Sequence, residues 1–186
     1  MTRTKKAQAT WADVKASLQG FDRDDLQSLV KDLYAASKDN KAFLNARLNL
    51  GADQLQPYKD VISRWMKPDV TRNQLYSVAK AKKAITDYKK AIGTPSALAE
   101  LSIFYCEEVF DFLDFCSVDD EGYYTALMRM YAQAVKYVLQ SETAEQAPFI
   151  DRLDELRSRA RDIGWGVSYD FDELWYKADL DRHERH

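Results

Sequence analysis

Hydrophobic residues recur along this chain with the spacing of helices rather than of strands. Apolar side chains follow one another at intervals of three and four residues, and no alternation of apolar and polar residues persists long enough to predict a sheet. Only six glycines and four prolines are present, which disfavours a turn-rich sandwich or barrel. The pattern therefore predicts an all-α protein, a compact bundle of about eight helices arranged as irregular stacked αα-hairpins.

Capping residues predict where these helices begin and end. The predicted helix starts are Thr10, Asp22, Asn40, the segment 51–53, Thr71, Thr94 with Pro95, the segment 119–121, Ser141 or Thr143, and Asp170. The helix that opens at Thr71 is expected to run to Ile92 and to be stopped by Gly93. The segment after Asp22 carries a regular apolar stripe, formed by Leu26, Leu29, Val30, Leu33 and Tyr34.

The most hydrophobic part of the chain is a predicted helical hairpin over residues 96–140. Its two helices, 96–116 and 120–140, are apolar nearly all round and keep only narrow polar stripes. Such helices must be surrounded by others, so this aromatic hairpin is predicted to be the hub of the bundle. A hydrophobic ligand pocket is the alternative interpretation of its aromatic residues, and core packing is the preferred one.

Glu108 is the candidate buried acid, because helical geometry places it among the aromatic residues of the hairpin. A buried carboxylate must be paired or protonated. Three alternatives stay open: a side chain that snorkels to the surface or bonds a tyrosine or a helix end, a salt bridge to an arginine, or an acid with a raised pKa that lines a site.

Charge is strongly polarised along the chain although the formal net charge is only −3. Residues 94–128 contain eight acids and no base, whereas residues 64–90 contain eight bases against two acids. A cationic helix face and an acidic stripe are therefore predicted to form a candidate interaction surface. Its residues are Arg72, Lys80, Lys82, Lys83, Lys90, Glu100, Glu107, Asp111 and Asp114.

The chemistry available to the chain is restricted. Both histidines lie within the last four residues, the two cysteines have no histidine partner, and the glycines are scattered. No catalytic residue, metal site or cofactor is therefore predicted. No run of residues is apolar enough for a signal peptide or a membrane span, which predicts a cytoplasmic protein. The domain prediction is a single helical domain over residues 1–186, with polar, poorly ordered tails at 1–9 and 180–186.

Several blocks in the chain together carry a resemblance. They are Asp32–Tyr34, Asn40–Asn45, Ala79–Lys90, Ala99–Glu107, Asp120–Tyr124, Met130–Tyr131, Ile163–Val167 and Leu174–Tyr176. In this order, the blocks resemble an uncharacterised bacterial family of small helical proteins, a domain of unknown function. The resemblance implies a helical fold and a bacterial cytosolic setting but no activity. The positions it marks for a family-wide role are Lys82, Lys83, Asp87, Tyr105, Glu107, Asp120, Glu121, Gly164, Trp165 and Gly166.

These observations favour a non-enzymatic helical interaction module, an adaptor or scaffold, that docks a protein partner through its charge-polarised surface. Self-association of the basic face with the acidic face would give a homo-oligomer. The alternative is a nucleic-acid-associated protein that uses the basic face of residues 64–90. A third reading is an enzyme with a carboxylate and tyrosine site at Glu107 and Glu108. No membrane partner is predicted.

Overall fold

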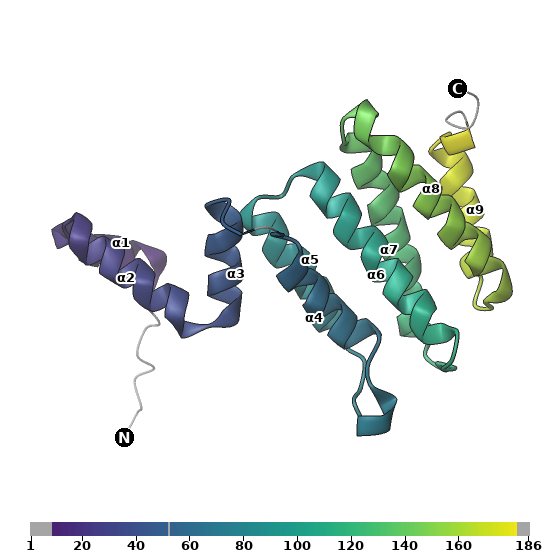
Figure 1. The fold of residues 1–186 in the computed structure, drawn as a ribbon, viewed down its shortest axis with the longest axis horizontal. Coiled ribbons are helices and arrows are strands. Elements are labelled where there is room, and N and C mark those ends of the chain that lie inside the picture. The colour runs from purple at the N-terminus through teal and green to yellow at the C-terminus, as the bar shows by residue number, and fades with distance from the viewer. Residues whose placement is uncertain (1–8, 52, 182–186) are drawn as a thin grey trace, which may run out of the picture. The chain divides into compact units, whose positions relative to one another are not determined.

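The computed structural model describes residues 9–51 and 53–181, which form helices joined by short loops (Figure 1). These residues contain nine α-helices and three short 3₁₀ turns, and no strand is found among them. The prediction of an all-α fold of about eight helices is confirmed. The chain divides into two compact units, an N-terminal unit of residues 1–44 and a C-terminal unit of residues 45–186. The single domain predicted over residues 1–186 stays a prediction.

The N-terminal unit is built from short helices with strong capping signals. Its elements are α1 Trp11–Ser17, η1 Leu18–Gly20, α2 Arg23–Ala36 and the first part of α3 Lys38–Arg47. Thr10 and Asp22 are the N-caps of α1 and α2, as predicted, and each forms a complete capping box with the residue three positions later. No residue of α1 or α2 is buried.

The predicted helix start at Asn40 is wrong, because α3 already begins at Lys38. The Ser37 hydroxyl accepts a hydrogen bond from the Asn40 backbone N–H at 3.1 Å and so does the capping. The Asn40 side chain instead donates from Nδ2 to the Leu33 carbonyl at the end of α2, at 2.8 Å. Asn40 therefore ties two helices together within the N-terminal unit.

The C-terminal unit is a series of antiparallel helical hairpins (Figure 1). Its elements are α4 Gln56–Met66, η2 Val70–Arg72, α5 Val78–Ala91, α6 Pro95–Leu113, α7 Glu121–Gln140, α8 Thr143–Arg159, η3 Ala160–Asp162 and α9 Val167–Lys177. Helix α6 contacts α4, α5, α7 and α8, while α7 contacts α8 and α9. The hairpin α6–α7 is thus the hub, as predicted from its apolar circumference.

Large side chains from α6, α7 and α9 fill the centre of this unit. The rings of Tyr131 on α7 and Phe171 on α9 stack at 3.7 Å between centroids, and Phe110 on α6 meets Phe171 edge-on at 6.2 Å. All three side chains are buried. Leu180, placed by the sequence in a polar tail, is also fully buried, because an apolar side chain is stabilised by leaving water. Residues 1–8 and 182–186 of the predicted tails lie outside the described residues.

The predicted helix from Thr71 to Ile92 is too long at its start. Asp69 caps the 3₁₀ turn η2 through the Thr71 backbone N–H, and Asn73 then adopts a left-handed conformation with φ of 53°. The chain returns to helix only at Val78, with Ser77 as the N-cap of α5. A left-handed residue breaks the helical backbone, so Arg72 does not belong to the α5 face that carries the lysines.

Other helix ends also differ from the prediction. Helix α4 begins at Gln56 rather than within the segment 51–53. Helix α6 ends at Leu113 rather than Cys116, and Phe115 beyond its end is 63% exposed. Helix α9 begins at Val167 rather than Asp170, directly after Gly166, whose φ is 75°. The stop at Gly93 is confirmed: its φ is 70°, and a Cβ there would lie 2.6 Å from the Lys89 carbonyl oxygen.

Candidate functional site

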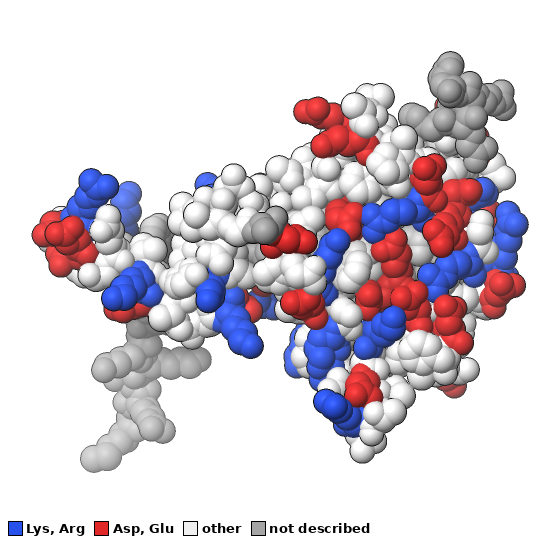
Figure 2. Space-filling view, in the orientation of Figure 1, with Lys and Arg blue, Asp and Glu red and all other residues white. Residues whose placement is uncertain are grey.

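The acidic stripe of α6 consists of Glu100, Glu107, Asp111 and Asp114. Their spacing of seven, four and three residues places them on one side of the helix. Helix α6 contacts both α4 and α8. Figure 2 shows Asp and Glu side chains interleaved with Lys and Arg over the part of the surface that these helices form.

Cations from α8 bind along this stripe. Arg152 donates from Nε and Nη2 to the two carboxylate oxygens of Glu107, at 2.7 and 2.8 Å, and from Nη1 to Glu100. Arg159 pairs through Nη2 with Asp111 at 3.1 Å and with Asp114 at 2.8 Å. A two-pronged arginine–carboxylate contact fixes geometry as well as charge, so the stripe sets the position of α8 against α6.

Cations from α4 bind the same stripe. Lys59 Nζ lies 2.5 Å from Glu100 Oε1, and Lys67 Nζ lies 3.0 Å from Asp111 Oδ2. Each of the four acids therefore has a cationic partner from a neighbouring helix. The acidic part of the predicted interaction surface is used inside the fold, and we call this set of contacts the ionic seam.

Three of the four cations in the ionic seam were missed by sequence reasoning, which considered bases only within residues 64–90. Lys67 falls in that range, whereas Lys59, Arg152 and Arg159 do not. The missed signal is a matched spacing: Arg152 and Arg159 are seven residues apart, as are their partners Glu107 and Asp114. Two helices that carry opposite charges at the same interval can pair along their length.

The ionic seam lowers the pKa of two of its acids. Burial opposes ionisation of Glu100 most strongly, yet hydrogen bonds from Arg152 and Lys59 together outweigh it and hold its pKa below the usual value. Asp111 behaves alike, since burial is outweighed by hydrogen bonds from Lys67 and Arg159 and its pKa is also lowered. Both side chains are therefore fully ionised at neutral pH.

Stability should consequently fall in acid. A carboxylate whose pKa is lower in the folded than in the unfolded chain stabilises the fold fully above the unfolded pKa, about 4.3 for Glu. That contribution is lost as the pH drops through the folded pKa. We expect the urea midpoint to be flat from neutral pH to about 5 and to fall below it. The Glu100→Gln variant, measured alongside, should show a shallower fall, and an equal fall in both chains would contradict this account.

The predicted basic residues are exposed but do not form one face. Arg72 lies in η2 and pairs with Asp69 at 3.2 Å, apart from the lysines of α5. Lys83 pairs with Asp87 one turn later on α5, at 2.5 Å. Lys82 and Lys90 are exposed on the same helix. The grouping of Arg72 with Lys83 and Lys90 on one helix face is thus wrong, because Arg72 is outside the helix.

The Trp65 ring contacts two further cations of the 64–90 segment. The Lys80 ammonium lies 3.8 Å from the centre of the indole ring, and the Arg64 guanidinium lies 4.5 Å from it. Lys89 lies beside the ring of Tyr137 on α7 and donates to its hydroxyl at 3.4 Å. Cation–π contacts of this kind stabilise the fold, so much of the basic character predicted for a partner is engaged within the protein.

Glu108 is half-buried, not fully buried as expected for a candidate buried acid. The Ser63 hydroxyl on α4 donates to its Oε2 at 2.7 Å. Neither a tyrosine nor an arginine is this hydrogen-bond partner, because Glu108 points toward α4 at a position where α4 carries a serine. A hydroxyl donor and access to water together satisfy an ionised carboxylate.

The Tyr105 hydroxyl is buried and has no hydrogen-bond partner among the described residues. Burial, with smaller effects of Cys106 and Tyr123, raises its pKa, so the phenol stays neutral. An unsatisfied buried hydroxyl costs roughly 1–3 kcal/mol. Tyr105→Phe should therefore increase the free energy of unfolding by about 1 kcal/mol in urea denaturation.

Tyr131→Phe is the matched control. Its hydroxyl is equally buried but donates to the Leu153 carbonyl at 3.1 Å. This variant should lose about 1 kcal/mol, the contribution of a typical hydrogen bond. Equal losses in the two variants would show that the Tyr105 hydroxyl has a partner after all.

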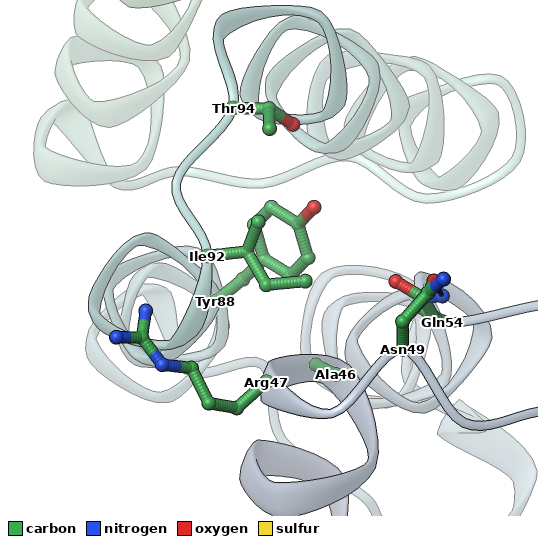
Figure 3. A pocket seen from close by; sticks show the side chains of 7 residues that line it. All are labelled: Ala46, Arg47, Asn49, Gln54, Tyr88, Ile92 and Thr94. Atoms are coloured by element: carbon green, nitrogen blue, oxygen red, sulfur yellow. Dashed lines mark hydrogen bonds between the residues drawn. The ribbon is translucent and has the colours of Figure 1, made fainter.

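A hollow of about 420 Å³ lies elsewhere in the C-terminal unit, near the ends of α3 and α5 (Figure 3). Tyr88 and Ile92 lie in its middle, and the Asn49 and Gln54 amides are hydrogen-bonded to each other on one side. Arg47 points away on the other side and donates from Nη1 to the Ala91 carbonyl at 3.0 Å. The carboxylates Glu107 and Glu108 do not line this hollow.

The Gly164–Gly166 turn holds Trp165 in a left-handed conformation, with φ of 61°. Its indole stacks on the ring of Tyr124 at 5.3 Å with an interplanar angle of 13°. The Tyr124 hydroxyl in turn donates to the Val118 carbonyl at 2.9 Å. Trp165 remains 49% exposed, so the indole covers a tyrosine at the surface rather than filling a gap between helices.

Other marked positions have structural roles. Asp120 is the N-cap of α7, where it accepts from the Gly122 backbone N–H at 2.8 Å and from the Tyr76 hydroxyl at 2.7 Å. The hydrogen bond to Asp120, with burial, raises the pKa of Tyr76 to about 12. Glu121 is exposed in the first turn of α7, where acids favour the helix dipole.

The N-terminal unit exposes large apolar side chains instead of burying them. We call these residues the N-terminal apolar set: Trp11, Val14, Phe21, Leu26, Val30, Leu33 and Phe43. Trp11 is 71% and Leu33 48% exposed. Single exposed apolar residues are ordinary, whereas contiguous apolar patches of several hundred Å² are typical of interaction sites. The apolar stripe of α2 was identified from the sequence, but its exposure was not predicted.

In the described residues no group of three or more His, Cys, Asp or Glu side chains is placed to hold a metal ion. Residues 9–51 and 53–181 likewise contain no helix that is both long enough and apolar enough to cross a membrane. Comparison with known proteins adds no relative: no protein-family model, curated protein or solved structure matches this chain significantly.

Proposed function

We propose that this protein is a non-enzymatic helical interaction module, an adaptor or scaffold, that docks a protein partner. The observation that carries the proposal is the N-terminal apolar set, seven large side chains exposed to water in a unit whose helices α1 and α2 bury none of their residues. Covering such surface is favourable by about 25 cal/mol per Å². A protein partner can cover these side chains with apolar surface of its own and so remove them from water.

This proposal moves the docking surface from the charged helices to the N-terminal unit. The ionic seam engages Glu100, Glu107, Asp111 and Asp114 with α4 and α8. A partner would have to displace these internal pairs to use the acidic stripe. The N-terminal apolar set needs no such displacement.

A catalytic role has less support than docking. Burial raises the pKa of the Cys106 thiol well above its usual value, helped by the nearby Glu107 charge, so the thiol stays protonated and a poor nucleophile. Glu107 is held by Arg152 and Glu108 by Ser63. Carboxylates fixed in this way are structural rather than poised for proton transfer.

We propose a cytoplasmic setting in a bacterial cell, as the family resemblance implies. Both cysteines are free thiols, Cys106 buried and Cys116 partly buried. Free thiols are the ordinary state in a reducing compartment.

The test is capture of a partner from native lysate by the purified full-length chain, compared with two variants. Leu33→Glu places a charge in the α2 stripe, whereas Ser28→Glu places the same charge about 140° away around the helix. A stoichiometric protein that binds the unmodified chain and Ser28→Glu but is lost with Leu33→Glu supports the proposal. A partner retained by Leu33→Glu, or the absence of any partner including a second copy of this chain, contradicts docking at this surface.

Nucleic-acid binding by residues 64–90 remains the alternative, with Lys82 and Lys90 as its best-placed exposed cations. Phosphate contacts would make binding weaken steeply with salt, by about 0.9 log units of affinity per log unit of salt for each contact. Filter binding to duplex and single-stranded DNA across a salt series, with Lys82→Glu plus Lys90→Glu as the variant, tests it directly.

A further inference from the structure

We propose that the N-terminal apolar set docks on the same surface of a second copy of this chain. The inference rests on the proposed function, because it identifies the partner as a like chain.

The need for a cover follows from the local sequence. Two complete capping boxes, at Thr10 with Asp13 and at Asp22 with Asp25, specify α1 and α2 as helices. Helices of seven and fourteen residues are marginal alone in water. Their stability has to come from packing of the amphipathic face, and in the described residues that face is exposed.

The charge of the unit selects the kind of cover. Residues 9–44 contain six acids and five bases, a net of −1. A helix that lies on an anionic membrane has a polar face rich in Lys and Arg. A protein surface that binds nucleic acid is likewise strongly basic. A nearly neutral unit meets little net repulsion from its own copy.

The area is sufficient for a pair. The seven side chains are 37–71% exposed. Because a whole aromatic side chain has 150–250 Å² of surface, together they expose roughly 600 Å². Two copies would therefore bury about 1,200 Å², the lower end of specific interfaces. Their residues are large and apolar, as in the centre of homodimer interfaces.

The flanks of the α2 stripe make the surface self-complementary. At 100° per residue, Arg23, Asp24 and Lys31 lie to one side of the stripe, which is the basic flank with a net charge of +1, and Asp25 and Asp32 lie to the other. All five side chains are exposed. A two-fold axis parallel to α2 brings the acidic flank of one copy against the basic flank of the other, twice. An antiparallel pair would place like charges together, so we expect the two α2 helices to run in parallel.

The first experiment measures the mass of the full-length chain in solution by sedimentation equilibrium over a range of concentrations. We expect a two-chain mass for the unmodified chain and for Ser28→Glu. In Leu33→Glu the symmetric pair would bury two unpaired carboxylates, and the dissociation constant should rise at least about 30-fold. A one-chain mass for the unmodified protein at all concentrations, or an unchanged dissociation constant in Leu33→Glu, would overturn the inference.

Stability and partner capture keep the outcomes separate. Leu33 is already half exposed, so the thermal midpoint of Leu33→Glu should match that of Ser28→Glu, which excludes unfolding as the cause of dissociation. If the chain is a monomer but Leu33→Glu still loses a lysate protein, the second copy is wrong and docking at this surface stands. If the pair forms and no other protein is lost, the second copy is the whole of the docking function.

The orientation has its own test. In a parallel pair, Asp32→Lys alone places a lysine opposite Lys31 of the other copy, whereas Lys31→Asp with Asp32→Lys restores an oppositely charged pair at this position. In a parallel pair the single change should weaken association about threefold and the exchange should restore it, because rim charges contribute modestly. Equal dissociation constants for the single and the double variant would contradict a parallel pair.

Discussion

Replacing Arg152 by alanine is expected to lower the free energy of unfolding by about 2–4 kcal/mol. Arg152 makes three charged hydrogen bonds, two to Glu107 and one to Glu100. Without the guanidinium, Glu107 loses both of these contacts, and Glu100, which is the more buried of the two acids, keeps only Lys59. The cost arises mainly from carboxylates left partly buried and poorly paired, rather than from the attraction itself.

Urea denaturation at neutral pH measures the Arg152→Ala loss, and two variants isolate its cause. Arg152→Lys keeps the charge without the planar fork and should recover only part of the stability. Lys177→Ala removes an exposed pair with Glu173 and should change the free energy by less than about 0.5 kcal/mol. A loss in Lys177→Ala as large as in Arg152→Ala would contradict this account, because exposed ion pairs would then contribute as much to stability as the partly buried ionic seam.

The helical fold was predictable because its main signals are local. Capping residues such as Thr10, Asp22 and Asp120 and the apolar circumference of α6 and α7 are read directly from the sequence. The predicted helix bounds were wrong where the local backbone conformation departs from what hydrophobic periodicity indicates. The left-handed Asn73 ends a helical segment that periodicity alone continues, and nothing in residue spacing identifies it.

The candidate site was less predictable because it depends on pairing between helices distant in sequence. The acidic stripe was identified correctly on one side of α6, since helical spacing alone fixes that. Its partners Lys59 and Arg152 lie 41 and 52 residues from Glu100, a relation that local pattern does not contain. Similarly, the α2 stripe was visible in the sequence, whereas its exposure is a property of the folded chain.

The charges expected to dock a partner are used in part inside the fold. The sequence pattern suggested an apolar interior and a charged docking surface. In the structure, the C-terminal unit has its apolar interior, the ionic seam joins α4, α6 and α8, and seven large apolar side chains of the N-terminal unit are exposed. Docking through an apolar surface responds weakly to salt, whereas docking through the seam would be screened within about 10 Å at 0.1 M. The salt dependence of partner binding therefore separates the two surfaces.

Replacing Phe171 by alanine should have the largest effect on stability, a loss of about 3–5 kcal/mol in the free energy of unfolding. The Phe171 ring is fully buried, stacked on Tyr131 and met edge-on by Phe110. Alanine would leave a cavity between α6, α7 and α9 and remove both ring contacts. Tyr169→Ala on the same helix is the matched control: its ring is 72% exposed, so its loss should stay within about 0.5 kcal/mol. Urea denaturation followed by near-UV circular dichroism compares them, and similar losses would mean that α9 is not anchored through Phe171.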